Sequence, residues 1–207
     1  MPRARPAAVA SQLVAVGRRF YARGWVLGTS GNFSAVVSRR PLRLAITASA
    51  VHKGRLRAQD ILRCDDRGRA VSGRPSAETL LHVELARRGA GAILHTHSVW
   101  ATVLSEGGAA DGGLAIEGYE MLKGLAGVTS HEHREWIPVL DNDQDIPRLA
   151  TRVGALLDGR ADLHAFLLRR HGLYTWGATL ADAERQVEIL EFLFETIGRA
   201  HQLGIRA

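Results

Sequence analysis

The sequence is poor in cysteine and in lysine. Cys64 is the only cysteine among the 207 residues, so one chain cannot form an internal disulfide or a cysteine-rich metal site. A lone cysteine favours a reducing compartment, and we expect the protein in the cytoplasm. Of the 27 basic residues only Lys53 and Lys123 are lysines, and the arginines are scattered as singles and pairs. Neither a basic block nor an aromatic RNA-binding motif accompanies them, so we expect no nucleic-acid partner.

Long apolar runs are missing as well. No stretch approaches the roughly 18 residues that a membrane span needs, and the N-terminal residues do not resemble a secretory signal. We therefore expect no membrane attachment. The formal net charge of +6 suits an anionic small substrate.

The composition is that of a folded globular chain. Hydrophobic residues make up 46% of the sequence and charged residues 23%. No internal repeat, low-complexity segment or linker divides the chain, so residues 1–207 are expected to form a single domain.

Apolar periodicity predicts helices and strands that alternate along the chain. The expected helices cover residues 7–23, 76–89 and 145–159, and a last helix begins at Thr179. The apolar face of that last helix consists of Ala183, Val187, Leu190, Phe194 and Ile197. The expected strands cover residues 33–37, 42–47, 92–97, 165–168 and 173–176. Hairpins outnumber strand–helix–strand crossovers, which predicts an α/β fold with three α/β/α layers and a mainly antiparallel central sheet.

Two histidines stand two positions apart at the end of the strand that begins at residue 92. Side chains at i and i+2 of a strand point the same way, so His95 and His97 can reach one ion. Imidazole is a standard zinc ligand, and a catalytic zinc site needs three protein ligands with one position open. His171 is the best third ligand, because it follows the strand at 165–168 and precedes Gly172, which permits close approach. These three histidines predict one divalent metal, with zinc as first choice among the ions that imidazole suits.

A second pair, His131 and His133, is a rival for this ion. It lies in a segment that is charged on both sides and has no apolar lead-in, which is typical of a solvated loop or edge. The other histidines are expected at the surface or in structural roles: His52, His82, His164 and His201.

A metal that polarises a carbonyl still needs a group that moves protons. Glu120 is one candidate, because it is an isolated acid between Tyr119 and Met121 in an apolar-leaning segment. Glu78 is the other, in the first turn of the helix expected from Ser76. The alternatives stay open: Glu78 could simply stabilise the helix dipole, and Glu120 could be a solvated helix residue.

A glycine-rich turn offers backbone N–H groups and hydroxyls that could hold a phosphate. It contains Thr29, Ser30, Gly31 and Asn32. Ser49 and Ser76 could add hydroxyls, the helix start at Ser76 could add free N–H groups, and we include Lys53 among the candidates. Each of these signals alone also fits an ordinary turn.

In order along nearly the whole chain, the motifs resemble the class II aldolase/adducin family. The matching segments are residues 28–34, 46–49, 75–79, 95–98 and 170–172. The resemblance implies zinc on His95, His97 and His171, one ion per subunit, with phosphate held near Thr29, Asn32, Ser49 and Ser76. It also implies a cytoplasmic homotetramer with sites near subunit boundaries.

The segment from Gly118 to Gly124 is similar to that of a dehydratase branch of this family, which acts in methionine salvage. There the acid/base glutamate corresponds to Glu120, whereas in the aldolases it corresponds to Glu78; we favour Glu120. The resemblance thus implies a metal-dependent hydro-lyase that acts on a phosphorylated ketose. The alternatives are a class II aldolase, an epimerase of another ketose phosphate, and a non-catalytic interaction domain like the adducin head.

Overall fold

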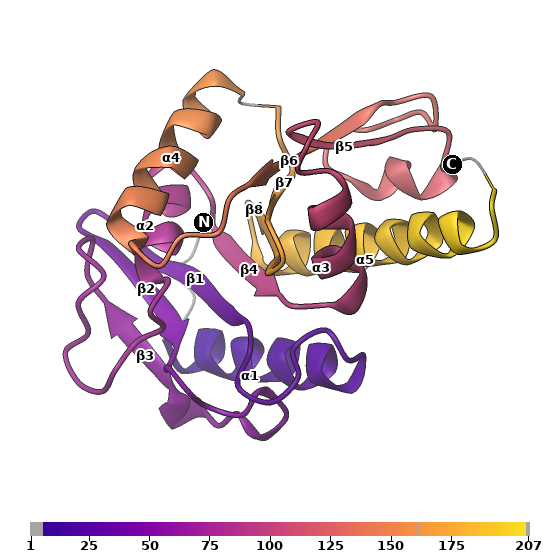
Figure 1. Ribbon diagram of the computed structural model, residues 1–207. Coiled ribbons are helices and arrows are strands. Elements are labelled where there is room, and N and C mark those ends of the chain that lie inside the picture. Colours follow the sequence, from indigo (N-terminus) through magenta and orange to yellow (C-terminus); the bar gives the residue numbers. More distant parts are fainter. Residues whose placement is uncertain (1–5, 161, 206–207) are drawn as a thin grey trace.

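An eight-stranded sheet forms the middle of the structure, a computed structural model that describes residues 6–160 and 162–205 (Figure 1). The strand order is β3-β2-β1-β4-β8-β7-β6-β5. In chain order the strands are β1 Asn32–Arg39, β2 Leu42–Thr47, β3 Ile61–Cys64, β4 Ala92–Thr96, β5 Gly113–Ile116, β6 Glu135–Leu140, β7 Ala165–Leu168 and β8 Gly172–Gly177.

The sheet is mainly antiparallel, as predicted, but it is mixed. Only β6 and β7 run parallel among the described strands, and every other neighbouring pair is antiparallel. The helix α4 (Ile146–Gly159) joins β6 to β7. A parallel pair requires a long crossover of this kind, whereas a short turn can join antiparallel strands.

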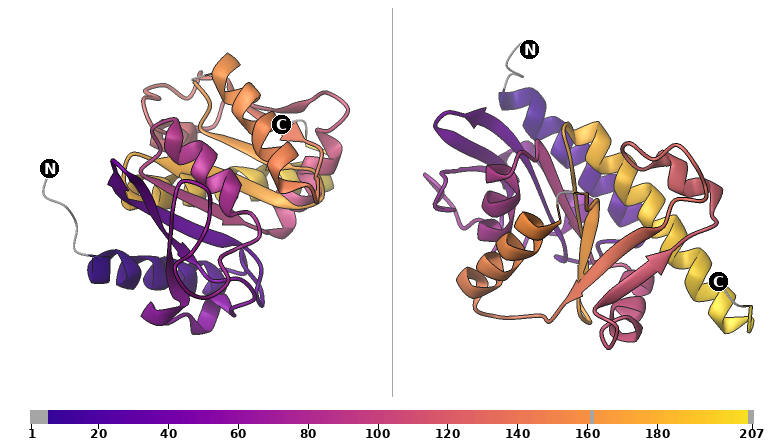
Figure 2. Two further views of the ribbon diagram at one scale, coloured as in Figure 1. Left: turned by 90° about the vertical axis from the view of Figure 1, so that its left-hand side faces the viewer. Right: turned by 90° about the horizontal axis from the view of Figure 1, so that it is seen from above.

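Helices cover both faces of the sheet, which confirms the three-layer prediction (Figure 2). The helices α1 (Pro6–Ala22), α3 (Val99–Gly107) and α5 (Leu180–Gln202) pack on one face, and α2 (Thr79–Arg87) and α4 pack on the other. Three short 3-10 helices complete the elements: η1 Lys53–Arg55, η2 Ala58–Asp60 and η3 Glu120–Gly124. Among the described helices none is long and apolar enough to cross a bilayer.

The last helix, α5, carries the apolar face that the sequence predicts. All five predicted side chains are buried: Ala183, Val187, Leu190, Phe194 and Ile197. The Thr179 side chain caps this helix by accepting from the backbone N–H of Asp182, as expected for a threonine before a helix.

The second predicted helix begins later than expected. The sequence places its start at Ser76, but α2 begins at Thr79, after a turn in which the N–H of Thr79 donates to the carbonyl of Ser76. The helix α3 was not predicted. It starts directly after His97, and Ser98 caps it by accepting from the N–H of Ala101. Its nine residues are too few for a clear helical period to emerge from the sequence.

Candidate metal centre and active site

Three neighbouring strands bring polar residues together on one face of the sheet. The strand β4 lies between β1 and β8, and His95 is directly opposite Asn32 on β1 and Tyr174 on β8. Directly opposed residues on neighbouring strands share a face. The β7–β8 turn carries His171 to the same end of β4 at which His97 stands.

The Nε2 atoms of His95, His97 and His171 meet at one point. The distances are 2.8 Å between His95 and His97, 3.1 Å between His97 and His171, and 3.3 Å between His95 and His171. Tetrahedral zinc ligands at about 2.0–2.1 Å from the ion stand roughly 3.3 Å apart. Within the described residues these three form the one group of histidine, cysteine or acidic side chains able to hold a metal.

Hydrogen bonds on the opposite ring nitrogens turn the Nε2 atoms toward this point. Nδ1 of His95 donates to the carbonyl of Leu173 at 2.8 Å, and Nδ1 of His171 lies 3.2 Å from Oδ1 of Asn142. Such partners fix the tautomer that leaves Nε2 free to bind a metal. Burial lowers the pKa of all three imidazoles, strongly for His95 and His97. They are therefore neutral at pH 7, the state in which imidazole binds metal.

Two glycines allow the backbones to come this close. A Cβ at Gly172 would lie 1.9 Å from the carbonyl oxygen of Thr96, so no other residue fits beside β4. Gly31 has φ +73°, and a Cβ there would lie 2.7 Å from the carbonyl oxygen of His95. The requirement for glycine after His171 agrees with the close approach that the sequence indicates.

Glu78 is the carboxylate beside the metal cluster. Its Oε2 lies 3.4 Å from Nε2 of His95, and its Oε1 lies 3.7 Å from Nε2 of His171. The residue precedes the first turn of α2 and faces the cluster from the helix layer above the sheet. Glu78 is thus close enough to exchange a proton with a ligand bound at the histidines.

A cavity of about 490 Å³ opens next to His97, His171 and Glu78. All the candidate phosphate-binding residues line it: Thr29, Ser30, Gly31, Asn32, Ser49, Lys53 and Ser76. Oγ of Ser30 is buried there without a hydrogen-bond partner. An orphaned hydroxyl in a polar cavity indicates a missing polar ligand.

The candidates Lys53 and Asn32 are less free than the sequence suggests. Lys53 is only 1% exposed, and its Nζ donates to the carbonyls of Thr29 and Val51. Burial lowers the pKa of Lys53 to about 8, so most of its charge persists at pH 7. The amide of Asn32 is engaged at both ends, with Glu78 and with His82.

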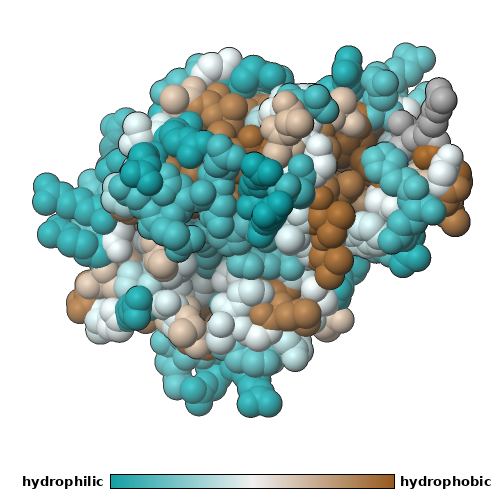
Figure 3. Space-filling model, in the orientation of Figure 1, coloured by the Kyte–Doolittle hydropathy of each residue, from teal (hydrophilic) through white to brown (hydrophobic). Residues whose placement is uncertain are grey.

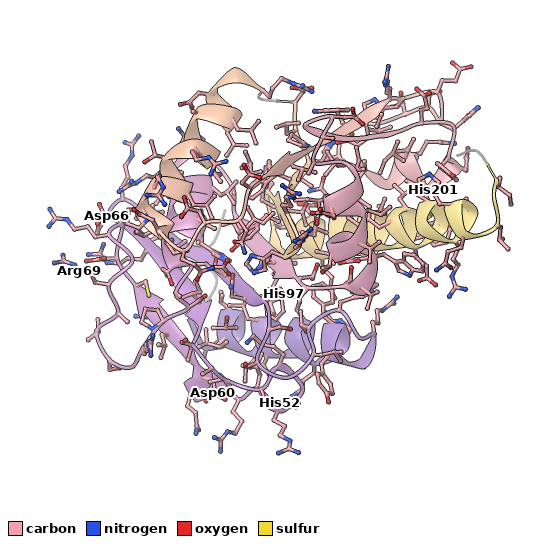
Figure 4. The ribbon with its side chains drawn as sticks, in the orientation of Figure 1. His52, Asp60, Asp66, Arg69, His97 and His201 are labelled. Carbon is pink, nitrogen blue, oxygen red and sulfur yellow. The ribbon has the colours of Figure 1, made fainter. Side chains whose placement is uncertain are left out.

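Glu120 lies apart from the histidine cluster within one chain. It stands on η3, the salmon-coloured coil on the right of Figure 1, whereas Figure 4 labels His97 near the centre of the molecule. Its side chain is 74% exposed and pairs with Lys123 at 2.7 Å. His131 is 3.9 Å from the same carboxylate, and His133 bonds to Glu135, so the rival pair does not face a common point.

Three residues around the cluster are not singled out by the sequence. His82 is fully buried, which fits the structural alternative, and its position four residues after Glu78 was a usable signal for its place near the cluster. Glu191 of α5 accepts a hydrogen bond from Thr96, on the opposite face of β4. Asn142 follows β6, and nothing in its local sequence indicates a contact with His171.

Comparisons with known proteins agree with this geometry. The chain is 49% identical over 195 residues to the methylthioribulose-1-phosphate dehydratase of Methylococcus capsulatus, covering 93% of this chain and 94% of that protein. It is 48% identical over 191 residues to the protein of the same name from Pseudomonas fluorescens, covering 90% of each.

Solved structures share the fold across the whole sheet. YgbL from Escherichia coli superposes with a TM-score of 0.80 at 25% identity, covering 94% of this chain and 90% of that one. L-fuculose-1-phosphate aldolase from Thermus thermophilus superposes with a TM-score of 0.76 at 28% identity, covering 96% and 97%. Residues 11–197 match the family described as the class II aldolase and adducin N-terminal domain. The resemblance seen in the sequence motifs is therefore confirmed, and the chain belongs to the class II aldolase/adducin family.

Proposed function

We propose that the protein is a metal-dependent hydro-lyase that removes water from methylthioribulose 1-phosphate in methionine salvage. The observation that carries the proposal is the cluster of His95, His97 and His171, in a chain 49% identical to a protein named as that dehydratase. The expected product is 2,3-diketo-5-methylthiopentyl 1-phosphate. A non-catalytic adducin-like domain would have no use for three imidazoles that face one another beside a polar cavity.

We propose Zn²⁺ as the metal, one ion per subunit, held by the three Nε2 atoms. The donor set fits, because three neutral imidazoles with a vacant fourth position are the usual protein part of a catalytic zinc site. A divalent ion there would polarise the ketose carbonyl and make the neighbouring C–H bond more acidic. Elemental analysis of purified protein tests the identity and stoichiometry of the metal.

Residues of the chain would carry out proton abstraction and phosphate binding. Glu78 is placed to take the proton from C3, and the cavity residues hold the phosphate. For that role the unpartnered hydroxyl of Ser30 and the buried charge of Lys53 are the best supported. The C4 hydroxyl leaves as water once it receives a proton, and the resulting enol tautomerises to the diketone.

We further propose that Glu120 of a neighbouring subunit supplies the proton to the leaving hydroxyl. Its exposure and its distance from its own cluster support action on another copy of the chain. Val99 and Val103, one turn apart on α3, are 66% and 56% exposed, and Figure 3 shows an apolar strip along this helix. Such a surface supports association between subunits, and we propose a homotetramer of single-domain subunits in the cytoplasm.

The products of the reaction test the function directly. Purified protein with its metal, given methylthioribulose 1-phosphate, should yield the diketone phosphate and water. Dihydroxyacetone phosphate with an aldehyde would instead identify an aldolase, and an epimeric ketose phosphate would identify an epimerase. Either result would reject the dehydratase.

Substitution of the two glutamates tests their roles. Glu78→Gln and Glu120→Gln should each lower kcat by about 10²- to 10⁴-fold, since each removes one proton-transfer group. Both variants should keep their metal, because neither changes an imidazole. A Glu120→Gln protein with full kcat would remove that residue from the reaction.

Subunit mixing tests whether Glu120 acts on a neighbour. Glu120→Gln and His97→Ala proteins should each be inactive alone. Co-expressed at equal levels, they should recover about a quarter of wild-type activity, since half of the sites keep their histidines and half of those face an intact Glu120. No recovery in a mixed oligomer would contradict action across the subunit boundary.

A further inference from the structure

A chain of hydrogen bonds leads from the interior of the protein to Glu78. Nδ1 of His82 lies 2.7 Å from Oγ of Ser34, Nε2 of His82 bonds to Oδ1 of Asn32, and Nδ2 of Asn32 donates to Oε2 of Glu78 at 2.7 Å. Ser34, Asn32 and His82 are all buried. Ser34 and His82 are fully buried, so the bonds between them and to Asn32 are made away from bulk solvent.

The two periodicities of strand and helix place the four residues. Asn32 and Ser34 are two positions apart on β1 and so point to the same face of the sheet. Glu78 is the residue just before α2, and His82 follows it by four positions, so both side chains lie on one side of that helix. The helix packs on the face of the sheet that Asn32 and Ser34 share.

The direction of each bond follows from the chemistry of its ends. A carboxylate only accepts, so the amide nitrogen of Asn32 must face Glu78. The amide oxygen then faces His82, which must donate from Nε2. With Nε2 protonated, Nδ1 of a neutral His82 accepts from the hydroxyl of Ser34. Every proton therefore points from the interior toward the carboxylate.

The surroundings keep His82 neutral and fixed. Burial lowers its pKa to about 4, against the opposing effect of the Glu78 charge. Tyr174 meets the His82 ring edge-on at 5.9 Å between centroids and stacks flat on His95 at 4.0 Å. The ring of a metal-binding residue and the ring of His82 are thus packed against one tyrosine.

We propose that Ser34 and His82 are positioning residues for Glu78, acting through Asn32, and that Asn32 orients this carboxylate instead of holding the phosphate. The inference rests on the proposed role of Glu78 in the reaction. The chain holds Oε2, while Oε1 lies 3.7 Å from Nε2 of His171.

Two substitutions of His82 by amide residues separate the effect of its hydrogen bond to Asn32 from the effect of its size. In His82→Gln the side-chain nitrogen falls where Nε2 stands, so it can still donate to Asn32. In His82→Asn the amide falls where Nδ1 stands, next to Ser34, and cannot reach Asn32. His82→Gln should keep kcat within about threefold, whereas His82→Asn should lose roughly 10- to 100-fold, as expected for loss of a buried bond that supports a charged group.

The kinetic constants and the metal content of Asn32→Ala show whether Asn32 orients Glu78 or holds the phosphate. Asn32→Ala should lower kcat by a similar factor, with KM within about threefold and one metal per subunit retained. Equal losses for the two His82 variants, or a raised KM with unchanged kcat in Asn32→Ala, would overturn the proposal.

The tautomer of His82 can be measured in the wild-type protein, so this test needs neither substrate nor a substituted protein. Long-range ¹H–¹⁵N spectra of histidine-labelled wild-type protein should show one fully buried imidazole with a slowly exchanging proton on Nε2 and none on Nδ1. The opposite tautomer would refute the chain of donors. If the protein failed to dehydrate methylthioribulose 1-phosphate while His82 showed the expected tautomer, only the proposed function would fall.

Discussion

Glu191 is a carboxyl group buried in the interior directly behind β4, the strand that carries His95. It is 2% exposed, accepts from Thr96 and is also hydrogen-bonded to Ser98, the residues on either side of His97. Burial raises its pKa to about 7, against the lowering effect of the two hydroxyls. Glu191 therefore fixes the side chains on either side of His97 and is protonated in much of the neutral range.

The raised pKa makes the stability of the protein depend on pH. In the unfolded chain Glu191 ionises near its ordinary value of 4.5, but in the folded chain it ionises only near 7. Folding stability is therefore lost as pH rises through this window. Relative to wild type, Glu191→Gln should gain about 2 to 3 kcal/mol in the free energy of unfolding between pH 5 and pH 8.

Urea unfolding with a chelator present, at both pH values, measures this difference without a contribution from the metal. Glu188→Gln on the same helix is the matched control. Glu188 is 41% exposed and pairs with Arg23, so its replacement should change stability by less than about 1 kcal/mol at either pH. A pH-independent difference for Glu191→Gln would contradict the assignment.

The β7–β8 turn is the element that presents His171, and α3 holds it in place. Arg170 has φ +53°, a left-handed conformation that is unfavourable for a residue with a Cβ. Its N–H donates to Oγ of Ser105, and its guanidinium pairs with Glu106 of α3. Thr102, also on α3, donates to the carbonyl of His171. The helix therefore maintains a strained turn that presents His171 to the histidine cluster.

Glycine and alanine at position 170 measure this strain. Both Arg170→Gly and Arg170→Ala remove the pair with Glu106, but only glycine adopts positive φ freely. The glycine variant should exceed the alanine variant by about 1 kcal/mol in the free energy of unfolding. At Arg169, where φ is not positive, the glycine variant should be no more stable than the alanine variant. An Arg170→Ala protein as stable as Arg170→Gly would show that the turn carries no such strain.

At the scale of the whole molecule, the metal site joins segments that are distant in the sequence. His95 and His97 belong to the middle of the chain and His171 to its last quarter, and the ion would hold them together only in the folded state. A ligand that binds only the folded chain stabilises it by mass action.

Removal of the metal should therefore lower the stability of the protein. With free zinc at a hundred times its Kd, stripping the ion should reduce the free energy of unfolding by about 2.7 kcal/mol. His97→Ala, which lacks a ligand, should show little or no response to chelator. Thermal unfolding with and without zinc, for both proteins, provides the measurement, and an equal response in the two would place the stabilising ion elsewhere.

Much of the fold follows from periodicity within short segments. The apolar stripe of α5, the strands at 92–96, 165–168 and 172–177, and the pairing of His95 with His97 on one face depend on neighbours within a few positions. Their geometry is local, so the residues themselves indicate it. The place of His171 after a strand and before Gly172 marked it as the third candidate ligand, and the ordered motifs added the family.

Only the tertiary structure decided which polar groups meet. Asn32 and Glu78 are 46 positions apart and bond to each other, and the buried His82 bonds to Asn32. The structure likewise sets Glu78 beside the histidines and leaves Glu120 exposed on η3. Such contacts depend on how β1, α2 and β4 pack against one another. The spacing of residues within one element does not indicate how that element packs against elements distant in the sequence.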